Sequence, residues 1–257
     1  MDPPMVDLVN ELKGKVAIVS GSARNIGRAT AIELAKGGAC LVINARKSIE
    51  LCEEVVLEIE KKGGEAIAVV ADISNANSVK KMVEKTVAKF GKVDILVNNA
   101  AVRSNIPFLE IDQTEWTRIA ATCLQGTLNL SRACIPHMIK EGGGAIVSLA
   151  GLSSYKGSPG RSHVMATKDG LMGLTRGIAI EFGEHNIRAN AAVVGRFDTV
   201  RSANAPQSGY KTEPEIPLGR KGHPQDIADL IRFLVGPGAS YISGQTIHVN
   251  GAAYCPH

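Results

Sequence analysis

Short apolar runs alternate with longer amphipathic segments along the whole chain. The short runs are rich in Val, Ile, Leu and Ala, and they predict strands at 15–21, 40–46, 65–72, 93–100, 145–151, 187–195 and 244–251. The longer segments carry apolar residues at helical spacing, and they predict helices at 26–38, 48–64, 79–90, 116–139, 162–183 and 223–236. Because the strands are apolar throughout, we expect helices to cover both faces of the sheet.

The alternation of strands and helices predicts the fold class. Parallel strands need long crossover connections, and a helix after each strand provides them. The sequence therefore predicts an α/β fold with a doubly wound, Rossmann-type parallel sheet in three α/β/α layers. No linker or repeat interrupts the pattern, so residues 1–257 are expected to form a single domain. Residues 200–222 lack periodicity and are rich in Pro, Ser and Gly, which predicts a substrate lid over the carboxyl edge of the sheet.

Composition narrows the class of protein. With 44% hydrophobic and 21% charged residues, the chain can bury a full core. The net charge of +4 is mild and the basic residues are dispersed, so we expect no nucleic-acid partner. The five cysteines have no metal-ligand spacing, so we expect no metal. The N-terminus is too polar for a signal peptide, and no apolar run approaches the ~20 residues of a membrane span, which favours a cytoplasmic protein.

The loop between the first predicted strand and its helix has the features of a phosphate site. It reads Ser20-Gly21-Ser22-Ala23-Arg24-Asn25-Ile26-Gly27. Glycine lets the backbone approach a pyrophosphate, and a helix N-terminus offers free N–H groups and the positive end of its dipole. We therefore expect a dinucleotide here, although a plain tight turn would also use these glycines. The expected contacts are Gly21, Arg24, Asn25, Ile26 and Gly27.

The end of the second predicted strand distinguishes the two nicotinamide dinucleotides. An NAD site has a carboxylate there for the ribose hydroxyls, but this strand ends in Asn44, Ala45 and Arg46. Arg46 and Arg24 would instead clamp a 2′-phosphate. NADP(H) is therefore favoured over NAD(H), with two solvated surface arginines as the alternative.

Motifs along nearly the whole chain resemble those of the short-chain dehydrogenase/reductase family. They are SGSARNIG at 20–27, ADIS at 71–74, NNAA at 98–101, GSPG at 157–160, ATK at 166–168, IRANAAVVG at 187–195 and YISGQTIHVNG at 241–251. The resemblance implies that Asp72 binds the adenine amine and that Asn98 lines the cofactor. It also implies that Thr199 meets the nicotinamide amide and that Lys168 holds the nicotinamide ribose. Ile73 and Gly195 complete the expected cofactor contacts.

The same resemblance implies that the family's catalytic Ser, Tyr and Asn are replaced in this chain. With GSPG fixed in register, Val164 stands where the Tyr precedes Lys168 by one helical turn. Gly151 occupies the position of the Ser, and Cys123 occupies the position of the Asn. In addition, Asn25 replaces a glycine of the phosphate loop. Hydride transfer to a carbonyl creates an alkoxide, and losing its general acid costs about 10²–10⁴ in rate. We therefore do not expect ordinary alcohol–carbonyl interconversion.

Neighbouring side chains are candidate replacements for the missing groups. The hydroxyl of Ser153 or the phenol of Tyr155, on the predicted loop after Gly151, would enter the pocket, unless Tyr155 only covers apolar surface. Cys123 would be a nucleophile or a small space-filling residue. His163 points about 100° away from Val164 around the helix, so we expect it to have a packing or interface role. The candidate catalytic residues are thus Lys168, Tyr155, Ser153 and Cys123. Arg103 and Arg196 would bind an anionic substrate or remain surface residues.

Three functions are compatible with these residues. The one we favour is an NADP(H)-dependent reductase of a small-molecule electrophile, an iminium, enone or activated carbonyl, that works without the usual tyrosine. The second is a non-redox enzyme of cyclase, lyase or hydrolase type that reuses the pocket, and the third is a non-catalytic cofactor-binding or partner subunit. The resemblance also implies a homotetramer with the helices around Leu124 and Leu174 at its interfaces. A hetero-oligomer would fit the third function.

Overall fold

A parallel sheet forms the centre of the protein. The computed structural model describes residues 9–200 and 215–256, and within them seven strands lie in the order β3-β2-β1-β4-β5-β6-β7. They are β1 (Val16–Val19), β2 (Cys40–Ala45), β3 (Ala66–Val70), β4 (Ile95–Asn98), β5 (Gly144–Gly151), β6 (Ile187–Val194) and β7 (Thr246–Val249). The strand order reverses between β1 and β4, which is the switch point of a doubly wound sheet. The predicted fold class is confirmed.

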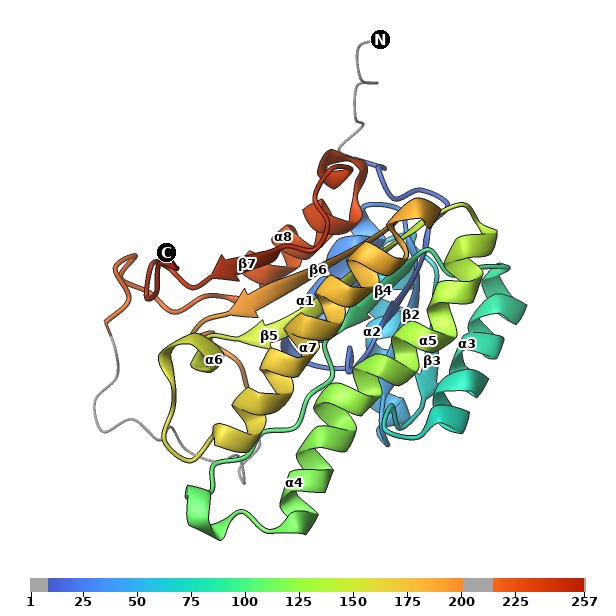
Figure 1. The fold of residues 1–257 in the computed structure, drawn as a ribbon. Coiled ribbons are helices and arrows are strands. Elements are labelled where there is room, and N and C mark those ends of the chain that lie inside the picture. Colours follow the sequence, from blue (N-terminus) through green and yellow to red (C-terminus); the bar gives the residue numbers. More distant parts are fainter. Residues whose placement is uncertain (1–8, 201–214, 257) are drawn as a thin grey trace.

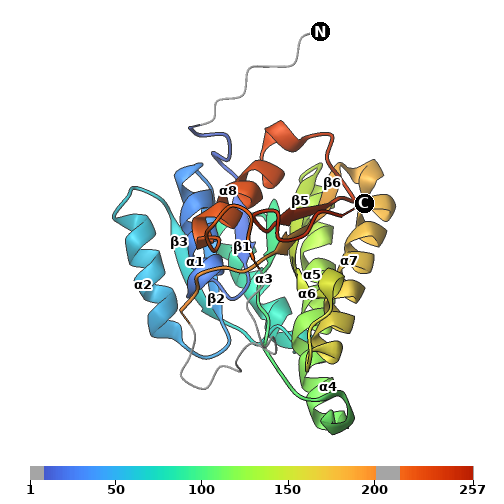
Figure 2. The same ribbon diagram turned by 90° about the vertical axis from the view of Figure 1, so that its left-hand side faces the viewer.

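Helices cover both faces of this sheet (Figure 1). They are α1 (Asn25–Lys36), α2 (Ile49–Glu60), α3 (Ala76–Phe90), α4 (Gln113–Ala120), α5 (Gly126–Lys140), α6 (Ser153–Lys156), α7 (Ser162–Glu181) and α8 (Pro224–Val235). Short 3₁₀ segments occur at η1 (Phe108–Glu110), η3 (Gly183–His185) and η4 (Pro237–Ala239). Figure 2 shows α1, α2 and α8 on one face and α3, α5 and α7 on the other, so the chain has the three expected layers.

The apolar strand sequences explain why both faces are covered. Successive residues of a strand point to opposite faces. In β1, Ala17 and Val19 belong to the core under α1, α2 and α8, whereas Ile18 belongs to the core under α3 and α5. All three are fully buried, and burying a Val or Ile side chain contributes about 1.5–3 kcal/mol. A strand with one polar face would leave one helical layer without a partner.

Capping residues determine where several helices begin and end. The Asn75 side chain accepts a hydrogen bond from the N–H of Ser78 at the start of α3, and Gly91 with a φ of 84° ends that helix. The Asp112 side chain accepts from the N–H of Glu115 at 2.7 Å at the start of α4. These bonds satisfy N–H groups that have no partner within the helix.

Two segments near the carboxyl edge differ from the sequence prediction. The predicted helix 116–139 is continuous in space, but α4 and α5 are joined by a π-helical segment, η2 (Ala121–Gln125). The predicted loop after Gly151 contains the one-turn helix α6. An extra residue in one helical turn hardly alters apolar periodicity, so the pattern could not reveal η2. Such π-helical turns are frequent at functional sites.

The predicted lid at 200–222 is described only at its two ends, because residues 201–214 lie outside the described ranges. Near its end, Gly222 donates to the Arg196 carbonyl at 2.8 Å and accepts from the N–H of Asp198 at 2.7 Å. This part therefore lies beside the segment that follows β6.

None of the helices in the described part of the chain combines the length and apolar character that a membrane span requires. The single domain over residues 1–257 stays a prediction.

Candidate active site

The loop after β1 is held by the loop after β4. The Ser20 hydroxyl accepts hydrogen bonds from the N–H groups of Asn99 and Ala100 at 3.0 and 3.1 Å. The Asn99 amide donates to the carbonyls of Ser20 and Gly21 at 2.8 and 3.0 Å. Four bonds thus fix the phosphate loop at the switch point. Sequence reasoning did not assign this role to Asn99, although it lies in the NNAA motif.

A second buried asparagine ties the same loop to β2 and β3. The Asn44 Oδ1 accepts from the N–H of Gly21 at 3.2 Å, and its Nδ2 donates to the carbonyls of Val69 and Ala71 at 3.1 and 3.2 Å. Its own N–H donates to the Ser22 hydroxyl at 2.9 Å. In the sequence, Asn44 was considered only because the second strand ends there without the carboxylate of an NAD site. In the structure it positions the loop.

The N–H groups in the first turn of α1, beside this loop, have no partner among the described residues. Arg24 precedes the helix in an extended conformation, makes no capping side-chain bond, and the first turn holds no acidic residue. Gly27 approaches the loop so closely that a Cβ there would lie 2.4 Å from the Gly21 carbonyl oxygen. Gly21 itself has a φ of +63°. Unsatisfied N–H groups, a positive dipole end and a glycine-dependent close approach fit the pyrophosphate of a dinucleotide.

An ionised carboxylate lies at the expected adenine end. Asp72 Oδ1 accepts from the N–H and the hydroxyl of Ser74 at 3.0 and 2.7 Å. The Ser74 hydroxyl lowers the pKa of Asp72 most, and the positive charges of Arg46 and Lys47 contribute. Asp72, Arg46 and Lys47 are therefore close enough to interact at the ends of β2 and β3. The next residue, Ile73, is buried.

Three other predicted cofactor residues lie at the carboxyl ends of β4 and β6. Asn98 is buried, and its Nδ2 donates to the Ser148 hydroxyl at 3.2 Å. Its Oδ1 has no hydrogen-bond partner within the described residues. The N–H of Gly195 donates to the Val249 carbonyl at 2.9 Å, and Thr199 lies half-buried four residues later. These positions follow the edge of the sheet where ligands bind in this fold.

Lys168 connects α7 to β5. Its ammonium group donates to the carbonyl oxygen of Leu149 at 2.6 Å. Burial lowers the pKa of the Lys168 amine, and the nearby Cys123 opposes this shift. Leu149 lies two residues before Gly151, and Val164 lies one helical turn before Lys168. The fold therefore brings Lys168, Cys123, Gly151 and Val164 into one neighbourhood.

Ser153 stands beside the open space at Gly151. Apart from its chain neighbours, the one atom of the described residues within 4 Å of a Cβ built on Gly151 is the Ser153 hydroxyl oxygen at 3.7 Å. Position 151 can therefore accept a side chain, and Ser153 already presents a hydroxyl there. Cys123 is buried in η2, and its thiol contacts the Val102 carbonyl oxygen at 3.8 Å. Of the candidate catalytic residues, the structure brings Lys168, Cys123 and Ser153 to the same end of β5.

Tyr155 is engaged by packing. Its hydroxyl donates to the Met172 sulfur at 3.3 Å, and its ring centre lies 4.4 Å from the edge-on ring of His248 and 5.5 Å from that of Tyr254. Burial raises the pKa of the phenol. Figure 1 shows α6, which carries Tyr155, beyond the arrowhead of β5. Of the two roles expected for Tyr155, these contacts favour the covering of apolar surface.

His163 packs at the junction of α4 and α7. Its side chain is fully buried, and its Nε2 lies 3.6 Å from the Glu115 carboxylate. Glu115 also accepts two hydrogen bonds from Arg118 at 2.7 and 2.8 Å, and this pairing lowers its pKa to about 2. The packing role expected for His163 agrees with this placement, since the ring is buried beside α4 rather than open to solvent.

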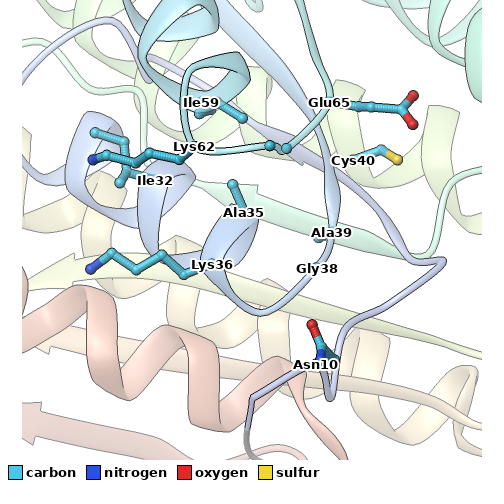
Figure 3. A pocket seen from close by; sticks show the side chains of 12 residues that line it. Asn10, Ile32, Ala35, Lys36, Gly38, Ala39, Cys40, Ile59, Lys62 and Glu65 are labelled. Atoms are coloured by element: carbon cyan, nitrogen blue, oxygen red, sulfur yellow. The ribbon is translucent and has the colours of Figure 1, made fainter.

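A hollow of about 270 Å³ lies at the opposite edge of the sheet (Figure 3). It is lined by the ends of α1 and α2 and by Cys40 at the start of β2. Its lysines are already paired, Lys36 with Glu33 at 2.7 Å and Lys62 with Glu58 at 2.8 Å. Within the described residues, no group of three or more His, Cys, Asp and Glu side chains could hold a metal ion. The carboxyl edge therefore remains the candidate site.

Comparison with known proteins gives close matches over nearly the whole chain. A family model described as enoyl-(acyl carrier protein) reductase matches residues 21–252. The chain is 38% identical over 242 residues to the 3-oxoacyl-(acyl-carrier-protein) reductase FabG of Staphylococcus epidermidis, and the match covers 93% of this chain and 99% of that protein. It is 34% identical to the protein of the same name from Thermotoga maritima, over 93% of this chain and 98% of that protein.

Solved structures give the same result. The crystal structure of a dehydrogenase/reductase from Sinorhizobium meliloti 1021 matches with a TM-score of 0.89 and 32% identity. The match covers 96% of this chain and 98% of that chain. The similarity therefore includes both the sheet and the helices that carry the candidate site.

Proposed function

Because the chain belongs to the short-chain dehydrogenase/reductase family of oxidoreductases, we propose that it binds NADP(H) and reduces a small electrophile that needs no tyrosine acid. One observation carries the proposal. The motif residues expected to bind the cofactor lie at the carboxyl edge of the sheet, whereas Gly151, Val164 and Cys123, which lie near Lys168, offer no hydroxyl or phenol that could protonate an alkoxide. The site is thus suited to hold a hydride donor but poorly suited to protonate an alkoxide.

The charges at the ends of β2 and β3 support NADP(H). Arg46 and Arg24 are exposed beside the phosphate loop, and β2 ends without a carboxylate. A guanidinium binds phosphate with two parallel hydrogen bonds, and in this place it would recognise the 2′-phosphate. Asp72, held ionised by Ser74, would accept from the adenine amine. The free N–H groups of α1 would hold the pyrophosphate.

The residues around Lys168 determine which substrates are reasonable. The bound nicotinamide would supply the hydride. Lys168 would hold the ribose, and the Ser153 hydroxyl would donate a hydrogen bond to the substrate in place of a serine at 151. Val164 offers an apolar wall and no proton. An iminium carbon becomes a neutral amine on receiving hydride, and an enone can take its proton on carbon from water. Both reactions avoid the alkoxide that a ketone would form.

The curated relatives are named for reduction of a 3-oxo group, and we do not extend that reaction to this chain. A ketone would need an acid near position 164. Losing general acid catalysis costs about 10²–10⁴ in rate, and losing one donor to the developing oxyanion costs a similar factor. We therefore propose that 3-oxo substrates are reduced poorly and that iminium, enone or activated carbonyl compounds are preferred.

Restoring the three positions tests this proposal. We expect Val164→Tyr combined with Gly151→Ser and Cys123→Asn to raise NADPH-dependent ketone reduction at least about 100-fold. The space beside Gly151 accommodates the new serine, and Gly151→Ala is the matched control because it adds a Cβ without a donor. An unchanged rate in a variant that still binds NADPH would contradict the proposal, as would ketone reduction by the wild-type protein as fast as iminium or enone reduction.

We also propose a homotetramer. Phe108, Leu109 and Trp116 are exposed around the start of α4, and Ile180 is exposed on α7. Phe108 and Trp116 line a hollow of about 480 Å³ between α4 and α7. Exposed apolar groups on neighbouring elements favour a subunit interface. Light scattering of the purified chain tests the proposal, and a monomer would contradict it and instead favour a hetero-oligomer with a different partner chain.

A further inference from the structure

The side chain of Asn25 joins two loops that are far apart in the sequence. Its Nδ2 donates to the carbonyl oxygen of Val200 at 3.0 Å. Its Oδ1 accepts from the N–H of Val200 at 2.9 Å. A carboxamide has a donor group and an acceptor group, so the two bonds match both main-chain groups of one residue. The contact is therefore made at two points.

The backbone at Asn25 explains why asparagine stands here. Its φ of +51° lies in the left-handed region, which glycine adopts freely and which asparagine tolerates better than most side chains. Asparagine therefore preserves the turn into α1 and adds a carboxamide that glycine lacks. Most other polar residues would strain the turn at this position.

The contact crosses the candidate cofactor cleft. Asn25 follows β1 and Val200 follows β6, and β4 and β5 lie between these strands in the sheet. The two bonds therefore connect loops on either side of the carboxyl ends of β4 and β5. Asn98 is the last residue of β4, and Lys168 on α7 is bonded to β5. The groups proposed to contact the cofactor therefore lie at the two strands that the contact between Asn25 and Val200 crosses.

We propose that Asn25 and the main chain of Val200 form a clasp across the dinucleotide cleft, which must open each time the cofactor enters or leaves. This inference rests on the proposed cofactor site. The Val200 side chain is 86% exposed, so the clasp opens without disturbing the core. Two solvent-exposed hydrogen bonds between neutral groups favour the closed state by about tenfold. The clasp therefore slows cofactor exchange and leaves the affinity nearly unchanged.

Stopped-flow measurement of NADPH binding to the full chain tests the clasp. We expect Asn25→Gly, which keeps the left-handed turn and the main-chain N–H expected to face the pyrophosphate and removes only the carboxamide, to raise both the association and the dissociation rate constants about tenfold. The dissociation constant then changes less than about threefold, because both rates change together.

Asn186→Gly is the matched control, because Asn186 has a φ of +58° and is exposed but lies far from Asn25 in the fold. Its exchange rates should equal those of the wild-type protein. Unchanged dissociation in Asn25→Gly, or an equal acceleration in Asn186→Gly, overturns the clasp.

Hydrogen exchange without cofactor separates the clasp from the proposed function. The Val200 amide should exchange about tenfold more slowly in the wild-type protein than in Asn25→Gly. Equal exchange overturns the clasp even where NADPH binds. A second outcome is slow exchange in the wild-type protein that is lost in Asn25→Gly, while neither protein binds NADPH or NADH. This outcome contradicts the proposed function and the role of the clasp in cofactor exchange. The bonds between Asn25 and Val200 would then be only a structural contact.

Discussion

Lys168 shows at the scale of one residue how the site differs from an ordinary lysine environment. Its ammonium group donates to the Leu149 carbonyl oxygen at 2.6 Å, and burial lowers the pKa of the amine. An amine with a lowered pKa loses its proton at a lower pH than an exposed lysine, whose usual value is about 10.4. The charge that would hold a ribose is therefore sensitive to alkaline pH.

This lowered pKa predicts a pH dependence of cofactor binding. The ammonium is present below its pKa, so NADPH affinity should fall as the pH rises through the lowered pKa of Lys168. Titration by fluorescence from pH 7 to pH 10 would measure it. Lys168→Arg is the matched control, because arginine stays charged over this range and should give a flat profile. The same fall in both proteins would show that another group is responsible.

A second prediction concerns the contribution of Arg46 to cofactor affinity. We expect Arg46→Ala to weaken NADPH binding about 10- to 100-fold and NADH binding much less, because charge-assisted hydrogen bonds to the 2′-phosphate are lost. Lys80→Ala is the control, because Lys80 is an exposed cation on α3 away from the cleft. Isothermal titration with both cofactors measures the ratio. An equal loss of both would refute the assignment of Arg46 to the 2′-phosphate.

At the scale of elements, the junction of α4 and α7 positions the π-helical segment that contains Cys123. The Asp112 cap begins α4, and Glu115 joins Arg118 on the same helix to His163 on α7. The two charge-assisted bonds from Arg118 lower the pKa of Glu115 to about 2. These bonds keep Glu115 ionised at a site where its side chain is mostly covered.

This pairing predicts an acid-dependent contribution to stability. Glu115 has a lowered pKa, so its contribution is fully present above about pH 4.3, its usual unfolded value, and is lost as the pH falls toward about 2. Glu115→Gln should lower the free energy of unfolding by about 1 kcal/mol at pH 7 and by less at pH 3. Urea unfolding measures it, with Glu84→Gln on α3 as an exposed control. A difference that is independent of pH would contradict the pairing.

The elements also show what the sequence could and could not predict. Apolar periodicity located the strands and main helices, because it reflects burial on the two faces of one sheet. It did not reveal η2 or α6, since a π-helical turn and a single helical turn change the pattern by only one or two residues. The roles of Asn44 and Asn99 were missed because their partners lie on other loops.

At the scale of the whole molecule, the sheet order places distant residues in one site. Asp72, Lys168 and the phosphate loop could be named from motifs, because each motif lies at a strand end and parallel strands end at one edge. The contact between Asn25 and Val200 could not, since the two residues are 175 positions apart and no local pattern links them. The contacts of Tyr155 with Met172 and His248 could not be predicted either, because the three residues lie on different elements.

The central claim is that the site holds NADP(H) but lacks the acid that a ketone requires. Single-turnover oxidation of NADPH by the wild-type chain tests it most directly, with a cyclic iminium compound and the ketone of the same ring as paired substrates. Our account predicts tight NADPH binding and rapid hydride transfer to the iminium, with transfer to the ketone slower by about 10²–10⁴. Equal rates for the two substrates, or no binding of NADPH, would contradict it.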